Sequence, residues 1–226
     1  MQIVIPAIGA QYELEAARML SAYPSAMLIT ERTPGIETSF SIPLLNGLAT
    51  KANFASFLPD DLKGPILLCD ADLFPVVPDP LSAFSVKQTT DIAYVPYPGK
   101  LITPWPDYNA ALEVTSKINS GFIYFKNITI AKHVSSLWYE KYKERMNQYL
   151  SGEVNTDRKG EFDEPSLILV LSKLNYNLEL LDQKWNVWDA FQGDVAYFKQ
   201  EHLSNYSPYI QPGISMFTNY APIPNN

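Results

Sequence analysis

Cysteine is nearly absent from this chain, which has a single one, Cys69, among 226 residues. One thiol cannot form a disulfide within the chain, so a disulfide framework is excluded and apolar packing must stabilise the fold. Cys69 lies in an apolar run, where a cysteine behaves as a small hydrophobic residue. The hydrophobic fraction of 46% is enough for one sizeable core.

Glycine and basic residues are also scarce. The chain has 10 glycines, below the usual share of about 7% of residues, and this disfavours a glycine-rich phosphate loop. Lys and Arg number 17 against 24 Asp and Glu, which gives a formal net charge of −7. Because nucleic-acid binding needs a basic face, we expect no nucleic-acid partner.

Long apolar runs and a targeting segment are missing as well. No stretch approaches the ~18 apolar residues of a membrane-spanning helix, and residues 1–6 contain no basic region. We therefore expect no membrane span, no signal peptide and a cytoplasmic protein. The charged fraction of 18% beside the hydrophobic 46% also excludes a disordered chain.

Proline and tyrosine are the residues in excess, with 18 and 14 copies. They gather in residues 94–108, which we expect to form a loop lined by aromatic rings. The polar residues 151–160 predict a second loop, and the residues after Gly193 predict an irregular tail.

Apolar periodicity alternates between strand and helix along the chain. Strands are expected at 2–8, 26–30, 66–70, 91–96, 118–125 and 177–181, and helices at 10–22, 44–57, 129–150 and 163–174. The alternation is typical of βαβ units, so it predicts an α/β fold whose mostly parallel central sheet is flanked by helices. No linker separates two cores, so we expect a single domain over residues 1–226 with halves at 1–95 and 96–226.

Two carboxylates, Asp70 and Asp72, follow the apolar strand expected at 66–70. Ligands in open α/β sheets lie beyond the carboxyl ends of the strands, where these side chains can converge. Two carboxylates so close repel each other unless a cation joins them, and hard oxygen ligands suit Mg²⁺ or Mn²⁺, which in turn hold a diphosphate. A surface turn with two aspartates is the other interpretation.

Residues 67–74 resemble the Asp-x-Asp motif of the GT-A-fold, nucleotide-sugar-dependent glycosyltransferases. Other segments follow in the order of that family: the strand and loop at 4–9, a helix with a basic residue at Lys51, the strand that opens with Asn119-Ser120-Gly121, and the acidic helix start Asp163-Glu164. The resemblance covers about residues 1–190. It implies a Rossmann-like GT-A domain of minimal length, in which residues 1–95 bind the nucleotide and residues 96–226 face the acceptor.

The resemblance also implies roles for single residues in binding the donor. The loop Pro6-Ala7-Ile8-Gly9 would cradle the base with help from Glu31 or Arg32, Lys51 would approach a phosphate or the sugar, and Asn119, Ser120 and Gly121 would lie beside the sugar. An ordinary strand-to-helix turn, a solvated helical lysine and a turn before an edge strand are the alternatives.

The metal would be bound by the same acidic segment. Asp70 would contact the ribose or reach the metal through water, Ala71 would line the donor site, and Asp72 would bind the metal directly. Because many similar enzymes recruit a third ligand, often His, from their C-terminal part, His202 is the candidate for that ligand.

Asp163 and Glu164 have two interpretations. Locally, Asp163 suits a helix N-cap, and Glu164 suits the first turn beside Pro165. By the resemblance, one of the two carboxylates lies near the reacting sugar. It would act as the general base in an inverting enzyme or orient the donor in a retaining one.

The expected function is a metal-dependent glycosyltransferase that uses Mn²⁺ or Mg²⁺. It would transfer a hexose from a nucleoside diphosphate sugar, UDP-glucose or UDP-galactose, to a hydroxyl of a carbohydrate or other acceptor. The alternative is a non-catalytic carbohydrate- or nucleotide-binding protein on the same scaffold. An aspartate-based phosphatase is disfavoured, because its aspartates normally follow the first strand, which here ends in Pro6-Ala7-Ile8.

Overall fold

The computed structural model describes residues 1–36, 43–96, 107–108, 111, 117–154, 163–187 and 196–200. Most of the expected loop at 94–108, most of the loop at 151–160, and His202 lie outside these residues. In the described part of the chain, no helix combines the length and apolar character needed to cross a membrane.

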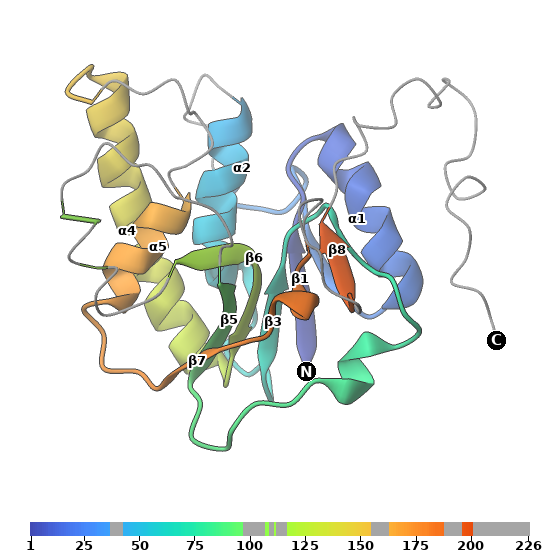
Figure 1. Cartoon of the computed structure of the whole chain (residues 1–226). Coiled ribbons are helices and arrows are strands. Elements are labelled where there is room, and N and C mark those ends of the chain that lie inside the picture. Colours follow the sequence, from blue (N-terminus) through green and yellow to red (C-terminus); the bar gives the residue numbers. More distant parts are fainter. Residues whose placement is uncertain are drawn as a thin grey trace.

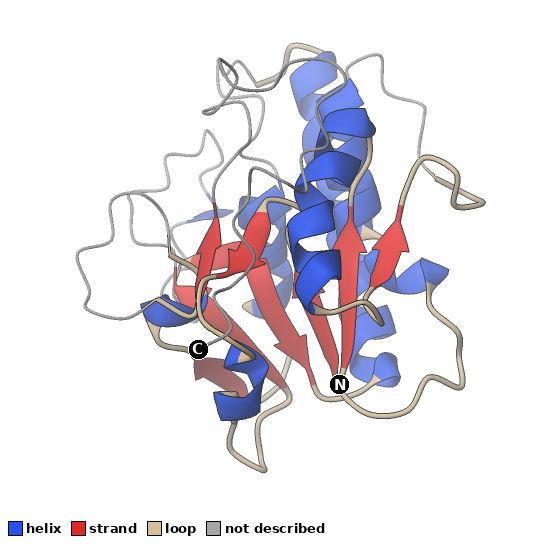
Figure 2. Ribbon diagram, turned by 90° about the vertical axis from the view of Figure 1, so that its right-hand side faces the viewer, coloured by secondary structure: helices blue, strands red, loops and turns tan. Residues whose placement is uncertain are grey.

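A six-stranded sheet forms the centre of the molecule, with helices on both faces (Figures 1 and 2). Its order is β2–β1–β3–β6–β5–β7, formed by Met27–Ile29, Gln2–Pro6, Ile66–Cys69, Ile118–Phe125, Ile92–Pro96 and Leu178–Leu180. Of these strands only β6 runs against the others, because it is antiparallel to both β3 and β5 while the remaining pairs are parallel. The predicted α/β fold with a mostly parallel sheet is therefore confirmed.

Successive residues of the central strands pack against different helices. Val4 and Leu68 belong to the core under α2 (Pro43–Ala52), α4 (Ile128–Leu150) and α5 (Asp163–Leu171). Ile5 and Leu67 belong to the core under α1 (Ala10–Ala22). Since both faces of the sheet are covered, the strands are apolar runs without alternating polar residues, as the sequence of β3 shows.

Several predicted elements agree with the structure and others are divided or shortened. The helix at 10–22 and the strand at 118–125 have the predicted bounds. The helix predicted at 44–57 is α2 followed by the 3₁₀ helix η1 (Phe54–Phe57), and the helix predicted at 163–174 ends at Leu171. Two further 3₁₀ helices are η2 (Pro80–Ala83) and η3 (Gln183–Trp185).

A second, small sheet pairs β4 (Leu73–Pro75) with β8 (Phe198–Gln200). Residues 198–200 lie in the segment expected to be irregular. Each strand has only 3 residues, too few for a periodic pattern, and the pairing joins segments far apart in the sequence. This small sheet brings residues 198–200 next to the Asp-x-Asp segment.

Strand β6 bulges where it passes the end of β3. Its pairing with β5 shifts between Tyr94↔Ile123 and Val95↔Asn119, so Ser120 and Gly121 lie in the irregular part of the ladder. The backbone N–H of Asp70 donates to the carbonyl of Gly121 across 3.1 Å. Bulges redirect side chains, and this one places the start of β6 beside the two aspartates.

Candidate functional site

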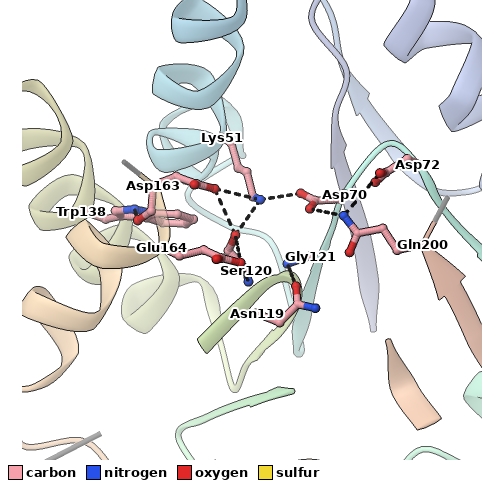
Figure 3. A network of polar contacts seen from close by, with 10 residues as sticks. All are labelled: Lys51, Asp70, Asp72, Asn119, Ser120, Gly121, Trp138, Asp163, Glu164 and Gln200. Atoms are coloured by element: carbon pink, nitrogen blue, oxygen red, sulfur yellow. Dashed lines mark hydrogen bonds and ion pairs between the residues drawn. The ribbon is translucent and has the colours of Figure 1, made fainter. Parts of the chain in front are cut away.

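Lys51 is the centre of a polar cluster assembled from four elements (Figure 3). Its Nζ lies 2.6 Å from Oδ1 of Asp70, which follows β3, and 3.1 Å from Oδ2 of Asp163, the first residue of α5. The same ammonium donates to Oγ of Ser120 in β6 across 2.8 Å. An ammonium group has three donors, so this geometry uses all of them.

The lysine is buried, with 7% of its surface exposed. Burial alone would lower the pKa of Lys51, but the charges of Asp70 and Asp163 outweigh it, so the pKa rises above its ordinary value. Lys51 therefore stays protonated and joins the end of β3 to the start of α5. The alternative of a solvated helical lysine is wrong.

Asp163 and Glu164 both contact Ser120. Oδ2 of Asp163 accepts from Ser120 Oγ across 3.0 Å, and Oε1 of Glu164 accepts from the Ser120 backbone N–H across 2.9 Å. The indole N–H of Trp138 donates to the backbone carbonyl of Asp163 across 2.7 Å, which fixes the beginning of α5 to α4. Asp163 is 4% exposed and Glu164 is partly exposed.

The pKa of Glu164 is raised to about 8. Removal from water is the main cause, and the negative charge of Asp163 adds to it, while Lys51 and the hydrogen bond from Ser120 act in the opposite direction. The carboxylates around Lys51 outnumber its single positive charge. Glu164 therefore holds a proton near neutral pH.

Asp70 and Asp72 converge as the sequence predicts. Nε2 of Gln200, the last residue of β8, donates to Oδ2 of Asp70 across 3.1 Å and to Oδ2 of Asp72 across 3.3 Å. Arg18 of α1 donates to the backbone carbonyl of Asp72 across 3.1 Å and lies 4.0 Å above the Phe74 ring. Asp72 is 4% exposed, so this segment is not a surface turn.

Gly121 lies against three polar side chains. A Cβ at this position would be 2.7 Å from Nδ2 of Asn186, 2.8 Å from Oε1 of Gln200 and 2.9 Å from Oδ2 of Asp70. A Cβ there would force these side-chain ends to move. The backbone N–H of Gly121 donates to Oδ1 of Asn119 across 2.9 Å, which aligns that side chain with the bulge.

Alanine at position 121 is therefore expected to destabilise the protein by about 1–3 kcal/mol, the usual range for overpacking. Thermal unfolding of Gly121→Ala measures this. Gly47→Ala is the matched control, because its Cβ would lie 3.7 Å from Ile8, an ordinary contact, and alanine suits a helix better than glycine. Equal melting temperatures for the two variants would contradict the expectation.

Several buried polar atoms beside Gly121 have no hydrogen-bond partner in the described structure. They are Nδ2 of Asn119, both amide atoms of Asn186 and Oε1 of Gln200. Buried polar atoms are nearly always satisfied, so this concentration indicates a place for polar atoms of a ligand. Gln200 and Asn186 cannot be recognised from the sequence, because neither belongs to a motif and both reach the site through tertiary contacts.

The loop after β1 lies at the same edge of the sheet. The backbone N–H of Ala7 donates to the Ile29 carbonyl across 2.8 Å, which continues the β1–β2 pairing beyond Pro6. Gly9 follows Ile8 and has a φ of 104°, and its carbonyl accepts from Glu13 in the first turn of α1. Positive φ favours glycine, so Gly9 allows the sharp entry into α1.

Arg32 and Ala71 differ in their surroundings. The Arg32 guanidinium is exposed and lies 2.6 Å from the Glu13 carboxylate. Its ion pair is with α1, and no contact of Arg32 with the Lys51 cluster is found among the described residues. Ala71 is buried, with 5% exposed, between the two aspartates.

The donor set around Asp70 and Asp72 fits a hard divalent cation. Among the described residues, no group of three or more His, Cys, Asp or Glu side chains could hold a metal ion. Asp70 and Asp72 provide two carboxylates, and the Gln200 amide lies between them, where its N–H bonds both. Carboxylate and amide oxygens are ligands that Mg²⁺ and Mn²⁺ accept.

Comparison by sequence finds no relative, since neither a protein-family model nor a curated protein matches this chain. Comparison by structure finds an active-site mutant of LgtC with a TM-score of 0.54 and 10% sequence identity, covering 88% of this chain and 86% of that one. The galactosyltransferase LgtC in complex with donor and acceptor sugar analogues gives a TM-score of 0.52 with the same identity and coverage, 10%, 88% and 86%. This chain therefore has the GT-A fold of those glycosyltransferases.

Proposed function

We propose that this protein is a metal-dependent glycosyltransferase. It transfers a hexose from a nucleoside diphosphate sugar, UDP-glucose or UDP-galactose, to a hydroxyl group of a carbohydrate or other acceptor. The observation that carries this proposal is the buried Lys51, which joins Asp70 to Asp163 at the carboxyl end of β3, where α/β folds bind ligands. LgtC, a galactosyltransferase solved with donor and acceptor sugar analogues, supports the same substrate class.

The diphosphate belongs at the two aspartates in this proposal. Asp70 and Asp72 hold Mn²⁺ or Mg²⁺, and such a cation, when bound, offsets the charge of the leaving diphosphate. Lys51 remains protonated beside Asp70 and adds a fixed positive charge on the sugar side. An acidic protein can in this way bind an anionic donor without a basic face or a glycine-rich loop.

The sugar belongs next to the bulge of β6. Asn119 has an unpartnered amide nitrogen, and the Ser120 hydroxyl lies between Lys51 and Asp163. Oδ2 of Asp163 contacts both Lys51 and Ser120, so Asp163 acts as a positioning residue. Glu164 is partly exposed and is therefore the carboxyl that faces the reacting sugar.

The base belongs at the loop Pro6–Gly9, with Tyr12 as its stacking partner. Tyr12 lies 3.8 Å from the Cβ position of Gly9 and is partly exposed. Burial raises the pKa of its phenol, and so do the charges of Glu15, Asp72 and Asp70, which is consistent with a ring near the aspartates. Arg32, which follows β2 at the same edge of the sheet, helps to bind the base.

Removing the Tyr12 ring is expected to weaken UDP binding about 10-fold, because stacking on an aromatic ring contributes about 1–3 kcal/mol per base. Isothermal titration calorimetry of Tyr12→Ala with UDP and Mn²⁺ measures the loss. Tyr12→Phe is the control and should bind within about twofold of wild type, since it keeps the ring. A loss in Tyr12→Phe equal to that in Tyr12→Ala would assign the effect to the hydroxyl.

A thermal-shift titration with UDP, with and without Mn²⁺, tests the function directly. We expect UDP to raise the melting temperature of the protein, and UDP together with Mn²⁺ to raise it further. UDP release from a panel of UDP-sugars then tests catalysis in wild type and Asp72→Ala. Absence of a metal-enhanced shift with any nucleotide would overturn the proposal, and binding without release would indicate the non-catalytic alternative.

A further inference from the structure

Gln200 is held between the two aspartates by the pairing of β4 with β8. Leu73, the residue after Asp72, lies opposite Gln200 in that pairing. The Gln200 side chain reaches both carboxylates through one nitrogen, 3.1 Å from Asp70 and 3.3 Å from Asp72 (Figure 3). The fold thus positions this amide at the point where the two acidic groups meet.

One amide N–H group offsets two carboxylates only in part. An amide nitrogen carries a partial positive charge, while the aspartates carry two formal negative charges. The Lys51 ammonium contacts Oδ1 of Asp70, whereas Gln200 contacts the other oxygen of that carboxylate, Oδ2. A divalent cation held by the two aspartates would add positive charge to this pair.

The other end of the Gln200 amide has no partner in the described structure. Its Oε1 is buried without a hydrogen bond, 2.8 Å from the Cβ position of Gly121. Asn186, which is 3% exposed, places Nδ2 within 2.7 Å of the same point, and both of its amide atoms are also unpartnered. Two unsatisfied amides beside a pair of carboxylates indicate a place for polar atoms of a ligand.

We propose that Gln200 is the third protein ligand of the cation held by Asp70 and Asp72. In this structure Nε2 donates to both aspartates. Turning the Gln200 amide by half a revolution would present Oε1 to the cation, and turning the Asn186 amide in the same way would bring its Oδ1, in place of the Nδ2 that lies beside Gly121, to accept from Nε2. Asn186 is thus a positioning residue. This inference rests on the proposed function and assigns to Gln200 the place that the sequence suggested for His202.

A glutamine oxygen suits this place chemically. Mg²⁺ and Mn²⁺ accept amide carbonyl ligands together with carboxylates. Because the third ligand is neutral, the protein supplies two negative charges to a divalent ion and leaves the remaining positions for diphosphate oxygens. The site therefore binds the metal more tightly when the nucleotide is present.

Mn²⁺ binding in the presence of UDP, followed by electron paramagnetic resonance of the free ion, tests the assignment. Gln200→Ala should weaken Mn²⁺ binding at least about 10-fold, since even outer-shell partners of a metal contribute about 10- to 100-fold. Gln200→Glu keeps an oxygen ligand and should bind Mn²⁺ at least as tightly as wild type. Gln88→Ala, an exposed glutamine between η2 and β5, is the control and should not change the affinity.

Wild-type Mn²⁺ affinity in Gln200→Ala, with binding lost in Asp72→Ala, would overturn the role of Gln200 and leave the proposed function intact. No Mn²⁺ binding by wild type would overturn both this role and metal dependence, and UDP release in EDTA would then decide separately whether the protein transfers sugars. If Gln200→Ala unfolds, Gln200→Met, which keeps the length without an oxygen, repeats the measurement.

Discussion

Replacing Lys51 with methionine is expected to lower the melting temperature by roughly 10 °C. Removing one partner of a buried ion pair costs about 3–5 kcal/mol, and each kcal/mol corresponds to about 2–4 °C for a protein of this size. Lys51 is 7% exposed and compensates both Asp70 and Asp163. Without it, these two carboxylates remain in a poorly solvated site, where the donors found among the described residues are neutral.

A double-mutant cycle separates this effect from loss of packing. Asp163→Asn in the Lys51→Met background should recover part of the lost stability, because it removes one uncompensated charge and keeps the side-chain volume. Lys143→Met is the matched control, since Lys143 forms a partly exposed pair with Glu140 on α4, and exposed pairs contribute little.

The cycle can contradict the expectation in two ways. Equal melting temperatures for Lys51→Met and Lys143→Met would show that the buried pairs are not stabilising. Additive effects of Lys51→Met and Asp163→Asn would show that Lys51 and Asp163 are energetically independent, although Nζ and Oδ2 are 3.1 Å apart.

Local patterns predicted most of the central fold. The helix at 10–22 and the strand at 118–125 were predicted at their observed bounds, because helix amphipathicity and buried apolar runs depend on neighbouring residues alone. Asp70 and Asp72 were also found from local order, since they follow an apolar strand, and the ends of such strands meet at one edge of the sheet.

The rest of the site depends on contacts that no local pattern encodes. Gln200 reaches the aspartates because β8 pairs with β4, a contact between segments about 125 residues apart in the sequence. The position of Lys51 on a helix could be predicted, but its burial depends on the β6 bulge, which presents Ser120 to it. Asn186 follows a 3₁₀ helix and carries no motif, so only its unpartnered amide distinguishes it.

Glu164→Gln is expected to lower kcat about 100-fold or more while UDP affinity stays within about threefold of wild type. A positioned acid or base contributes about 10²–10⁴-fold to rate. Glu164 is partly exposed beside Ser120, whereas Asp163 is occupied by Lys51. The carboxylate is needed in its ionised form whether it takes the acceptor proton or faces positive charge that develops on the sugar.

Steady-state kinetics with the best donor, together with UDP titrations, measures both quantities. Glu179→Gln is the control, because Glu179 bonds the Thr90 hydroxyl and the Lys87 backbone at the edge strand β7, away from the aspartates. Wild-type kcat in Glu164→Gln would exclude Glu164 from the chemical step. An equal loss in Glu179→Gln would assign the effect to general destabilisation.

Titration of Glu164 should make the stability of the folded protein fall, and kcat/KM rise, as the pH increases. Its pKa rises from an ordinary 4.5 to about 8 in the folded protein, so the folded state holds the proton more tightly than the unfolded chain. The resulting stability is complete below pH 4.5 and is lost as pH rises through about 8. Over the same interval kcat/KM should increase, because the free enzyme gains the ionised carboxylate. In Glu164→Gln both slopes should disappear, and an activity slope retained in this variant would assign the titration to another group.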